Sequence, residues 1–188
     1  MRTDALNTIL TRRSIRSFSS KPVSDEQLRL ILEAARHAPS AGNCQARDII
    51  VVKDAGVRKQ LSAAALGQKF IEEAQLVLVV CANTERSGRR YGERGRLLYC
   101  LLDAAASVEN ILLAVNALKL GACWVGAFHD DLVCRILNLP KYLRPIAIIP
   151  IGFPAEPIEP ITRMPLKDFV HVDKYGSPFR EDPFEKLP

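Results

Sequence analysis

The apolar positions of the chain predict four β-strands. The stretch 76–82, LVLVVCA, is apolar at every position, which is typical of a strand buried on both faces. The stretch 48–53, DIIVVK, is rich in β-branched residues, and the stretch 146–152 is again mostly apolar. A fourth and shorter strand is expected at 122–125.

Helices are predicted where start signals precede segments with an apolar face. The clearest start is Ser24-Asp-Glu-Gln27, a capping box in which the serine oxygen accepts the third backbone N–H and the glutamine reaches back. This helix is expected to run to about His37, because Pro39 pushes the residue before it out of the α region. Further helices are expected at 4–10, 57–65, 97–120 and 130–137.

The longest predicted helix, 97–120, is apolar nearly all round. At ~1.5 Å per residue it would span roughly 36 Å, and one chain of this length has difficulty covering every face of it. Two interpretations stay open: a central helix within one subunit, or a helix between two copies of the chain. A membrane span is disfavoured, because Asp103 and Glu109 interrupt the apolar run and a charge at mid-bilayer costs about 2.5–3.5 kcal/mol.

Two segments lack a regular pattern. Residues 83–96 are polar and contain three glycines, so a loop is expected there. The tail, 153–188, holds seven of the twelve prolines, which disfavours a regular helix or a central strand. Because the tail also keeps apolar residues such as Met164 and Phe169, we expect it to wrap over the body or over a second subunit. The length indicates one domain, 1–188, that includes this tail.

Composition narrows the classes of function. The 188 residues are 48% hydrophobic and 25% charged, which is ordinary globular usage. The net charge of +5 suits a phosphate-bearing small molecule and is too small and scattered to indicate a nucleic-acid binder. The five cysteines include no C-x-x-C pair, so no zinc or redox site is indicated. With no apolar leader after Met1, a reducing, cytoplasmic location is expected.

Three arginines and three hydroxyl side chains lie within residues 11–18, TRRSIRSF. A guanidinium group presents a rigid fork of N–H donors that matches phosphate, and a serine adds a hydroxyl. Arg12, Arg13, Ser14 and Arg16 are therefore candidates to hold a phosphate monoester. The alternative that stays open is a helix end whose arginines face water. We call these four residues the arginine motif.

Two further stretches carry small residues where the chain is expected to turn. The stretch 39–45, PSAGNCQ, gives a tight loop whose backbone can approach a flat ligand, while Ser40 and Asn43 offer polar groups. In the stretch 121–128, GACWVGAF, Gly126 lacks a Cβ, so a planar ring could lie directly on its backbone. Each stretch alone also fits a plain turn.

In this order along the chain, these stretches resemble the nitroreductase family, the FMN-dependent NAD(P)H oxidoreductases. Each motif is short, but their joint occurrence is specific. The similarity covers roughly residues 8–176 and is closest to small prokaryotic members. The motifs that carry it are RRSIRSF, PSAGNCQ, LVLVVCA, LGACWVGAF and RMPLKDFVHVDKYG.

This resemblance implies an α+β fold, with a mixed four- or five-stranded sheet flanked by helices and the long helix at the interface of a homodimer. It implies an enzyme that binds FMN and transfers a hydride from NADH or NADPH to the flavin N5 atom. Two electrons would then pass to a nitroaromatic, a quinone or a similar small-molecule acceptor in a ping-pong cycle. The flavin is the reactive centre, so no side chain is assigned as catalytic, and no metal, nucleic acid or membrane is expected.

The resemblance also assigns cofactor contacts. The arginine motif would hold the phosphate, the ribityl chain and the pyrimidine edge, and a tail arginine would return to the phosphate. The loop of the partner subunit would lie against the ring, the backbone after the third strand would face N5, and a glutamine would contact the ring edge. The assigned residues are Arg12, Arg13, Ser14, Arg16, Pro39, Ser40, Ala41, Asn43, Gln68, Gly126, Ala127 and Arg163.

The chain departs from the family pattern beside the asparagine loop. The usual Gln-Pro-Trp is Gln45-Ala-Arg47 here, and the second serine of Pro-Ser-Ser is Ala41. These changes leave the FMN assignment standing and leave the acceptor open, because the loop borders the pocket. Two alternatives also stay open: another flavin reaction on the same fold, such as azoline dehydrogenation or dehalogenation, and a non-catalytic module that binds anions or nucleic acid. The preference between NADH and NADPH, the reactivity with oxygen, and the roles of Cys44 and of residues 86–96 stay open as well.

Overall fold

A four-stranded sheet lies at the centre of the computed structural model, which describes residues 4–157 and 161–179. The strands lie in the order β1-β2-β4-β3, and each pair of neighbours is antiparallel. Among the described residues, the parallel contribution to the sheet is one isolated bridge between Ser14 and Ala122. The four predicted strands are confirmed, with the bounds β1 Arg47–Val52, β2 Leu76–Asn83, β3 Gly121–Ala122 and β4 Leu143–Gly152.

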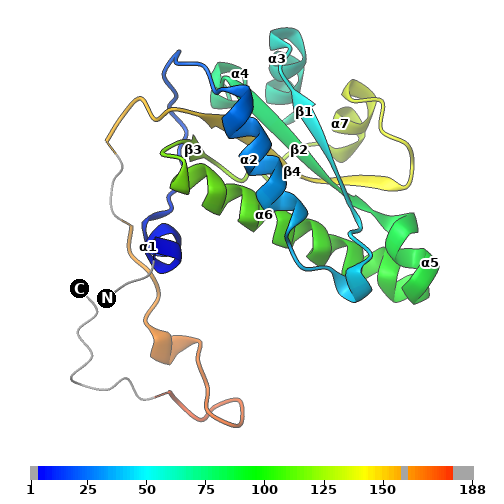
Figure 1. Ribbon diagram of the computed structural model, residues 1–188. Helices are drawn as coiled ribbons and strands as arrows, with labels where there is room; N and C mark the ends of the chain where they lie inside the picture. The colour runs from blue at the N-terminus through cyan, green and yellow to red at the C-terminus, as the bar shows by residue number, and fades with distance from the viewer. Residues whose placement is uncertain (1–3, 158–160, 180–188) are drawn as a thin grey trace. The chain divides into compact units, whose positions relative to one another are not determined.

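The central strand β2 is buried along its whole length, as its unbroken apolar sequence predicts. Successive side chains of a strand point to opposite faces of the sheet, so Leu78 and Val80 join one apolar cluster while Val77 and Val79 join another. Figure 1 shows the helices that cover the two faces. The first face carries α2 (Asp25–Arg36) and α6 (Cys100–Ala117), and the second carries α3 (Ala55–Ala64), α4 (Phe70–Glu73) and α7 (Asp130–Ile136).

The predicted capping box is present at the start of α2. The Ser24 side chain accepts the N–H of Gln27 at 3.1 Å, and the Ser24 N–H donates to the Gln27 side chain at 3.0 Å. Together these bonds satisfy two backbone donors that an uncapped helix leaves open. At the other end of the helix, the Ser107 hydroxyl of α6 donates to the Ala35 carbonyl at 3.0 Å, so the two helices are bonded as well as packed.

The prediction of a loop at 83–96 is wrong, because this segment is helical. Helix α5 spans Thr84–Arg94 and continues into a π-helical turn, η2, at Gly95–Tyr99. The Asn83 side chain caps α5 by accepting the N–H of Arg86 at 2.9 Å. Gly92 has φ +57°, which lets the chain kink inside the helical segment, so its glycine content does not signal a loop.

The long apolar helix is confirmed, with bounds that differ from the prediction. The chain is helical from Thr84 to Ala117, and by length and composition this stretch could cross a membrane, although 44% of its most apolar window is buried in the fold. The polar side chains of Asp103 and Ser107 are buried and hydrogen-bonded to backbone groups of the same chain, at Ala41 and Ala35. Such internal bonds are typical of a core helix.

The chain divides into two units, residues 1–158 and 159–188. In its described part, the second unit contains one 3₁₀ turn, Leu166–Asp168, and an isolated bridge between His171 and Pro178. The roles expected for the tail, as part of one domain and as a cover over the body or over a partner, stay predictions. Residues 158–160 and 180–188 lie outside the described part of the chain.

Candidate functional site

The arginine motif follows helix α1 (Asp4–Thr11) and runs along the β3 edge of the sheet. The Ile15 N–H donates to the Ala122 carbonyl at 2.9 Å, and the Ser19 N–H donates to the Phe153 carbonyl at 2.9 Å. These bonds pair the backbone on both sides of Arg16, whose side chain is exposed. The local fold therefore fixes the backbone of the motif and leaves its side chains available.

The three arginines have little negative charge to balance them. The Arg12 Nε lies 3.8 Å from Glu109 Oε1, which is a loose ion pair. Arg13 donates through Nη1 to the Leu10 carbonyl at 2.8 Å, so it caps the end of α1 as the helix-end alternative expects. Among the described residues, neither Arg13 nor Arg16 has a carboxylate within ion-pair distance. The cluster therefore carries an excess of positive charge that an anion would neutralise.

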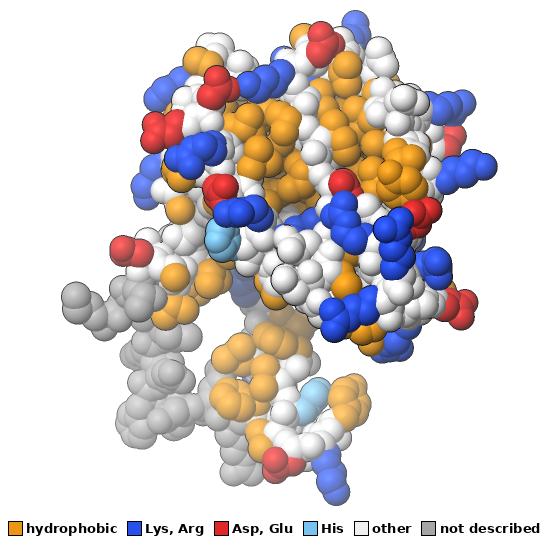
Figure 2. Space-filling view, turned by 45° about the vertical axis from the view of Figure 1, so that its right-hand side comes forward, with side chains coloured by type: hydrophobic (Ala, Val, Ile, Leu, Met, Phe, Trp, Pro, Cys, Tyr) orange, Lys and Arg blue, Asp and Glu red, His pale blue; other side chains and the backbone are white. Residues whose placement is uncertain are grey.

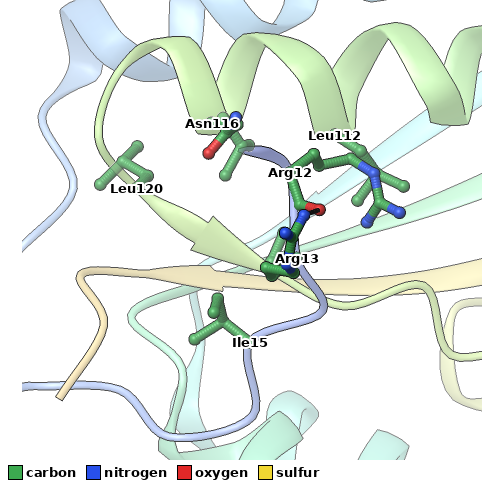
Figure 3. A pocket seen from close by; sticks show the side chains of 8 residues that line it. Arg12, Arg13, Ile15, Leu112, Asn116 and Leu120 are labelled. Carbon is green, nitrogen blue, oxygen red and sulfur yellow. Dashed lines mark hydrogen bonds between the residues drawn. The ribbon is translucent and has the colours of Figure 1, made fainter. Parts of the chain in front are cut away.

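A small pocket lies between the arginine motif and the C-terminal half of α6. Figure 3 shows Arg12 extending along the helix toward Leu112, with Asn116 above the motif. The Asn116 side chain donates to the Thr8 carbonyl at 2.8 Å and so holds α1 against α6. The pocket is lined by Arg12, Arg13, Ile15, Leu112, Val115, Asn116, Leu120 and Ala122.

The segment predicted to face a flavin ring follows β3 in the chain. Gly126 and Ala127 are exposed, and a Cβ built on Gly126 would approach only Trp124, at 3.9 Å. Gln68 donates through Nε2 to the Ala127 carbonyl at 3.2 Å and to the Ala65 carbonyl at 2.9 Å. The structure thus brings Gln68 and Ala127 together, and it leaves the backbone at Gly126 open.

The loop 39–45 lies at the other end of α6. The carboxylate of Asp103, which is 3% exposed, accepts the N–H of Ala41 at 2.9 Å and the N–H of Ala46 at 3.3 Å. Sequence reasoning missed this anchor, although a carboxylate inside an otherwise apolar helix is a signal that some donor must meet it. Beside the loop lies an open, largely apolar pocket of about 400 Å³, lined by Pro39, Ser40, Ala41, Tyr99, Leu102, Asp103 and Ala106.

Within one chain, the loop and the arginine motif are far apart. Asp103 contacts the loop and Asn116 lines the pocket beside the arginines, and these two α6 residues are separated by about 20 Å at ~1.5 Å per residue. The predicted residues therefore fall into groups: Arg12, Arg13, Ser14 and Arg16 at the β3 edge, Gln68, Gly126 and Ala127 beyond β3, and Pro39, Ser40, Ala41 and Asn43 at the loop. Arg163 is an exposed residue of the second unit, and its role stays a prediction.

Comparison with known proteins identifies the family and the fold. A sequence profile described as "Nitroreductase family" matches residues 9–79 and 59–153. The chain belongs to the nitroreductase family. A Thermus thermophilus protein named NADH dehydrogenase is 33% identical over an alignment of 194 positions, which covers 89% of this chain and 95% of that protein. The Salmonella typhimurium protein named oxygen-insensitive NADPH nitroreductase is 32% identical over an alignment of 170 positions, which covers 87% of this chain and 71% of that protein.

A solved structure with a bound nicotinamide cofactor has a similar fold. The NADPH:FMN oxidoreductase from Vibrio harveyi, complexed with NAD+, superposes with a TM-score of 0.85 at 28% identity. The similarity covers 92% of this chain and 78% of that chain. The predicted α+β architecture is therefore confirmed by the arrangement in space as well as by sequence.

Arg47, where this nitroreductase departs from the family's usual tryptophan, is a buried cation. It is 7% exposed, its Nη2 donates to the Arg36 carbonyl at 2.7 Å, and its Nη1 has no hydrogen-bond partner in the part of the chain that the structure describes. Burial lowers the pKa of Arg47, and the nearby Asp103 carboxylate acts in the opposite direction. Asp103 thus balances a buried charge in addition to anchoring the loop.

Cys123 lies directly behind the arginine motif. The residue is 2% exposed, and burial raises the pKa of its thiol although Arg16 and Ser14 act to lower it. The thiol therefore stays neutral and behaves as a small apolar side chain. All five cysteines of the chain are free.

Proposed function

We propose that this member of the nitroreductase family is an FMN-dependent NAD(P)H oxidoreductase. The observation that carries the proposal is the unbalanced arginine motif at the β3 edge, together with the open backbone at Gly126, which follows β3 in the chain. The first suits the phosphate of a flavin mononucleotide, and the second gives a planar ring room to approach. The names of the relatives, which include an NADPH nitroreductase and an NADPH:FMN oxidoreductase, support the same activity.

The residues of the motif would divide the work between them. Arg12 and Arg16 would neutralise the phosphate, and the Ser14 hydroxyl would donate one bond to it. Arg13, whose Nη1 already caps α1, would have its remaining N–H donors for the ribityl chain or the pyrimidine edge. Arg163 of the tail would complete the phosphate contacts, as the family pattern suggests.

FMN, when bound, would accept a hydride from NADH or NADPH and pass two electrons to an acceptor such as a nitroaromatic or a quinone. The chain would contribute binding, orientation and charge. Fixed guanidinium donors near the pyrimidine edge favour the more negative, reduced form of a bound ring and so raise its potential. Gln68, held by the Ala65 carbonyl, would position the Ala127 backbone against the ring.

A second copy of the chain is part of the proposal. Because the loop and the arginine motif of one chain are about 20 Å apart along α6, the loop of a partner would have to complete the site. Exposed apolar side chains that a partner would cover include Ile9 and Leu10 on α1 and Leu97 and Leu102 near α6. Light scattering should therefore report a dimer, and the ratio of flavin to protein absorbance should report one FMN per chain.

The visible spectrum of the purified protein tests the proposal most directly. We expect a yellow protein whose flavin absorbance bleaches when NADH or NADPH is added and returns when menadione or a nitrofuran is added. A folded protein that shows no flavin absorbance after incubation with FMN and removal of the free FMN would refute the proposal. Turnover with an azoline peptide or a halogenated aromatic, and none with menadione, would favour the other flavin reactions.

A module that binds nucleic acid gains no support from the face in view. Figure 2 shows basic side chains gathered at the lower right of the body and interrupted by acidic and apolar ones, whereas nucleic-acid binding favours a continuous basic stripe. A cytoplasmic location is part of the proposal, because five free cysteines fit a reducing compartment.

A further inference from the structure

Helix α5 turns two of its arginines onto the backbone of the loop 39–45. Arg90 donates through Nη1 to the Gly42 carbonyl at 2.8 Å. Arg86 donates through its own Nη1 to the Gln45 carbonyl at 2.7 Å and to the Arg47 carbonyl at 3.0 Å. The segment predicted to be a polar loop is therefore a helix that is hydrogen-bonded to another part of the chain.

The loop needs such bonds because of its backbone conformation. Gly42, Asn43 and Gln45 all have left-handed φ values, +53°, +56° and +51°. Glycine adopts this region freely and asparagine tolerates it, whereas Gln45 occupies it at a cost and persists there only when surrounding contacts hold it. Asp103 holds the loop from α6 below, and the two arginines hold it from α5.

The contact at Gly42 is close, so a larger residue there would make the Tyr91 and Arg90 side chains shift. A Cβ built on Gly42 would overlap the Tyr91 hydroxyl and lie 2.8 Å from the Arg90 Cζ. Tyr91 in turn packs against Tyr99, with ring centroids 5.1 Å apart, and Tyr99 lines the apolar pocket beside the loop. Contacts from α5 thus surround the outer side of the loop.

Some polar groups of the loop are used internally, whereas the side-chain amides of Asn43 and Gln45 make no hydrogen bond within the described residues. The Ser40 hydroxyl accepts the N–H of Gln45 at 2.9 Å. The exposed Asn43 side chain makes no hydrogen bond within the described residues, although its own backbone N–H donates to the Ser40 carbonyl at 3.0 Å. The backbone restraints therefore fix the direction in which a free amide projects.

We propose that Arg86 and Arg90 of α5 are positioning residues that hold the loop so that the Asn43 amide meets the flavin. This inference rests on the proposed function, because it assigns the flavin as the group that Asn43 contacts. The arginines do not touch the flavin themselves; they act through the carbonyls of Gly42 and Gln45. Their effect should therefore appear in flavin binding and should depend on Asn43.

The test compares Arg90→Ala with Arg89→Ala. Arg89 is the neighbouring residue on α5, and its only ion pair among the described residues is with Glu85 of the same helix at 3.6 Å, so its removal costs the same charge without touching the loop. FMN dissociation constants are measured by quenching of flavin fluorescence, with thermal unfolding of each apoprotein as a control. We expect Arg90→Ala to weaken FMN binding by about threefold to tenfold, as the loss of one hydrogen bond implies, and Arg89→Ala to leave it unchanged.

A double-mutant cycle with Asn43→Ala separates positioning from a general effect. If Arg90 acts through the loop, the variant lacking both side chains should bind FMN no more weakly than Asn43→Ala alone, within about twofold. Fully additive losses would overturn the proposal, and so would equal dissociation constants for Arg90→Ala and the wild type. Should Arg90→Ala unfold, Arg90→Lys takes its place in the cycle, because it keeps the charge but lacks the directed guanidinium fork.

The outcomes separate this inference from the proposed function. A wild-type protein that binds FMN while Arg90→Ala matches Arg89→Ala removes the positioning role alone. A wild-type protein that binds no FMN removes the proposed function and this inference with it. The expected pattern, with weaker binding only in Arg90→Ala and no further loss in the double variant, supports both.

Discussion

The arginine motif and the loop 39–45 lie at opposite ends of α6 and are built in opposite ways. At the arginine motif the backbone is paired into the sheet edge, and the charged side chains are left with little to balance them. At the loop the backbone is strained, and charged side chains from α5 and α6 are used to hold it. The arginine motif leaves charged side chains available for a ligand, whereas charged side chains at the loop stabilise the conformation of the loop itself.

This difference predicts how substitutions act in each region. A change at Arg12, Ser14 or Arg16 should alter ligand binding and leave the free energy of unfolding nearly unchanged, because Arg13 is the member of the motif whose side chain caps a helix. A change in the anchors of the loop should alter stability first. The following variants test this contrast, from the largest expected effect to the smallest.

Asp103→Ala should be the most damaging. The change leaves the N–H groups of Ala41 and Ala46 without an acceptor and the buried Arg47 without its nearby carboxylate. Removing one member of a buried charged network costs about 3–5 kcal/mol, which lowers the midpoint of thermal unfolding by roughly 10 °C for a chain of this length. Circular dichroism measures the shift, and a midpoint near the wild-type value would contradict the anchoring role.

Arg12→Gln and Arg16→Gln should weaken FMN binding and leave folding intact. A charged hydrogen bond contributes about 1.5–3 kcal/mol, so each dissociation constant should rise roughly 10- to 100-fold. Lys59→Gln removes one positive charge from an exposed position elsewhere on the surface and serves as the control. If the control weakens binding as much as the motif variants do, the effect is one of net charge only.

Gly126→Val should act on the ligand alone. The position is open, with only Trp124 near a built Cβ, so the added side chain fits the free protein. It would occupy the space into which the ring is proposed to approach, and FMN binding should weaken by about fivefold or more, as overpacking usually costs 1–3 kcal/mol. An unchanged dissociation constant would show that the ring does not approach this segment.

The last prediction concerns chemical reactivity rather than stability or binding, and it compares one cysteine from each of the two regions. Cys123, behind the arginine motif, is buried with a raised pKa, whereas Cys44, in the loop, is half-buried. Iodoacetamide at pH 8 should therefore label Cys44 at least roughly tenfold faster, because the exposed thiolate is the reactive species. Peptide mass spectrometry locates the label, and equal rates at the two positions would indicate a more open β3 edge than the structure has.

Local patterns were sufficient to predict most of the fold. The apolar run of β2, the β-branched run of β1 and the capping box of α2 are signals contained within a few neighbouring residues. Helix α5 was not predictable in the same way. Its glycines are poor evidence for a helix, and its place is secured by bonds to residues about 40 positions earlier in the chain, such as that from Arg86 to Gln45.

The candidate site shows the same difference between features with a local sequence signal and features that depend on long-range contacts. The arginine motif was predictable because its chemistry is contiguous in sequence, and the resemblance to the family supplied its ligand. The anchoring of the loop was not, because Asp103 and Ala41 are 62 residues apart and no local signal joins them. A residue that merely interrupts an apolar helix in the sequence proves to support the loop in space.

The central position of β2 has a consequence for the chain before it folds. Its neighbours β1 and β4 lie far away in the sequence, so both flanks of this strand must wait for long-range contacts to close. Until they do, the eight residues LVLVVCAN are uncharged, free of proline and exposed to other chains. Such a run is the kind that seeds intermolecular aggregates, so dilute, cool refolding should give a better yield of native protein than concentrated, warm refolding.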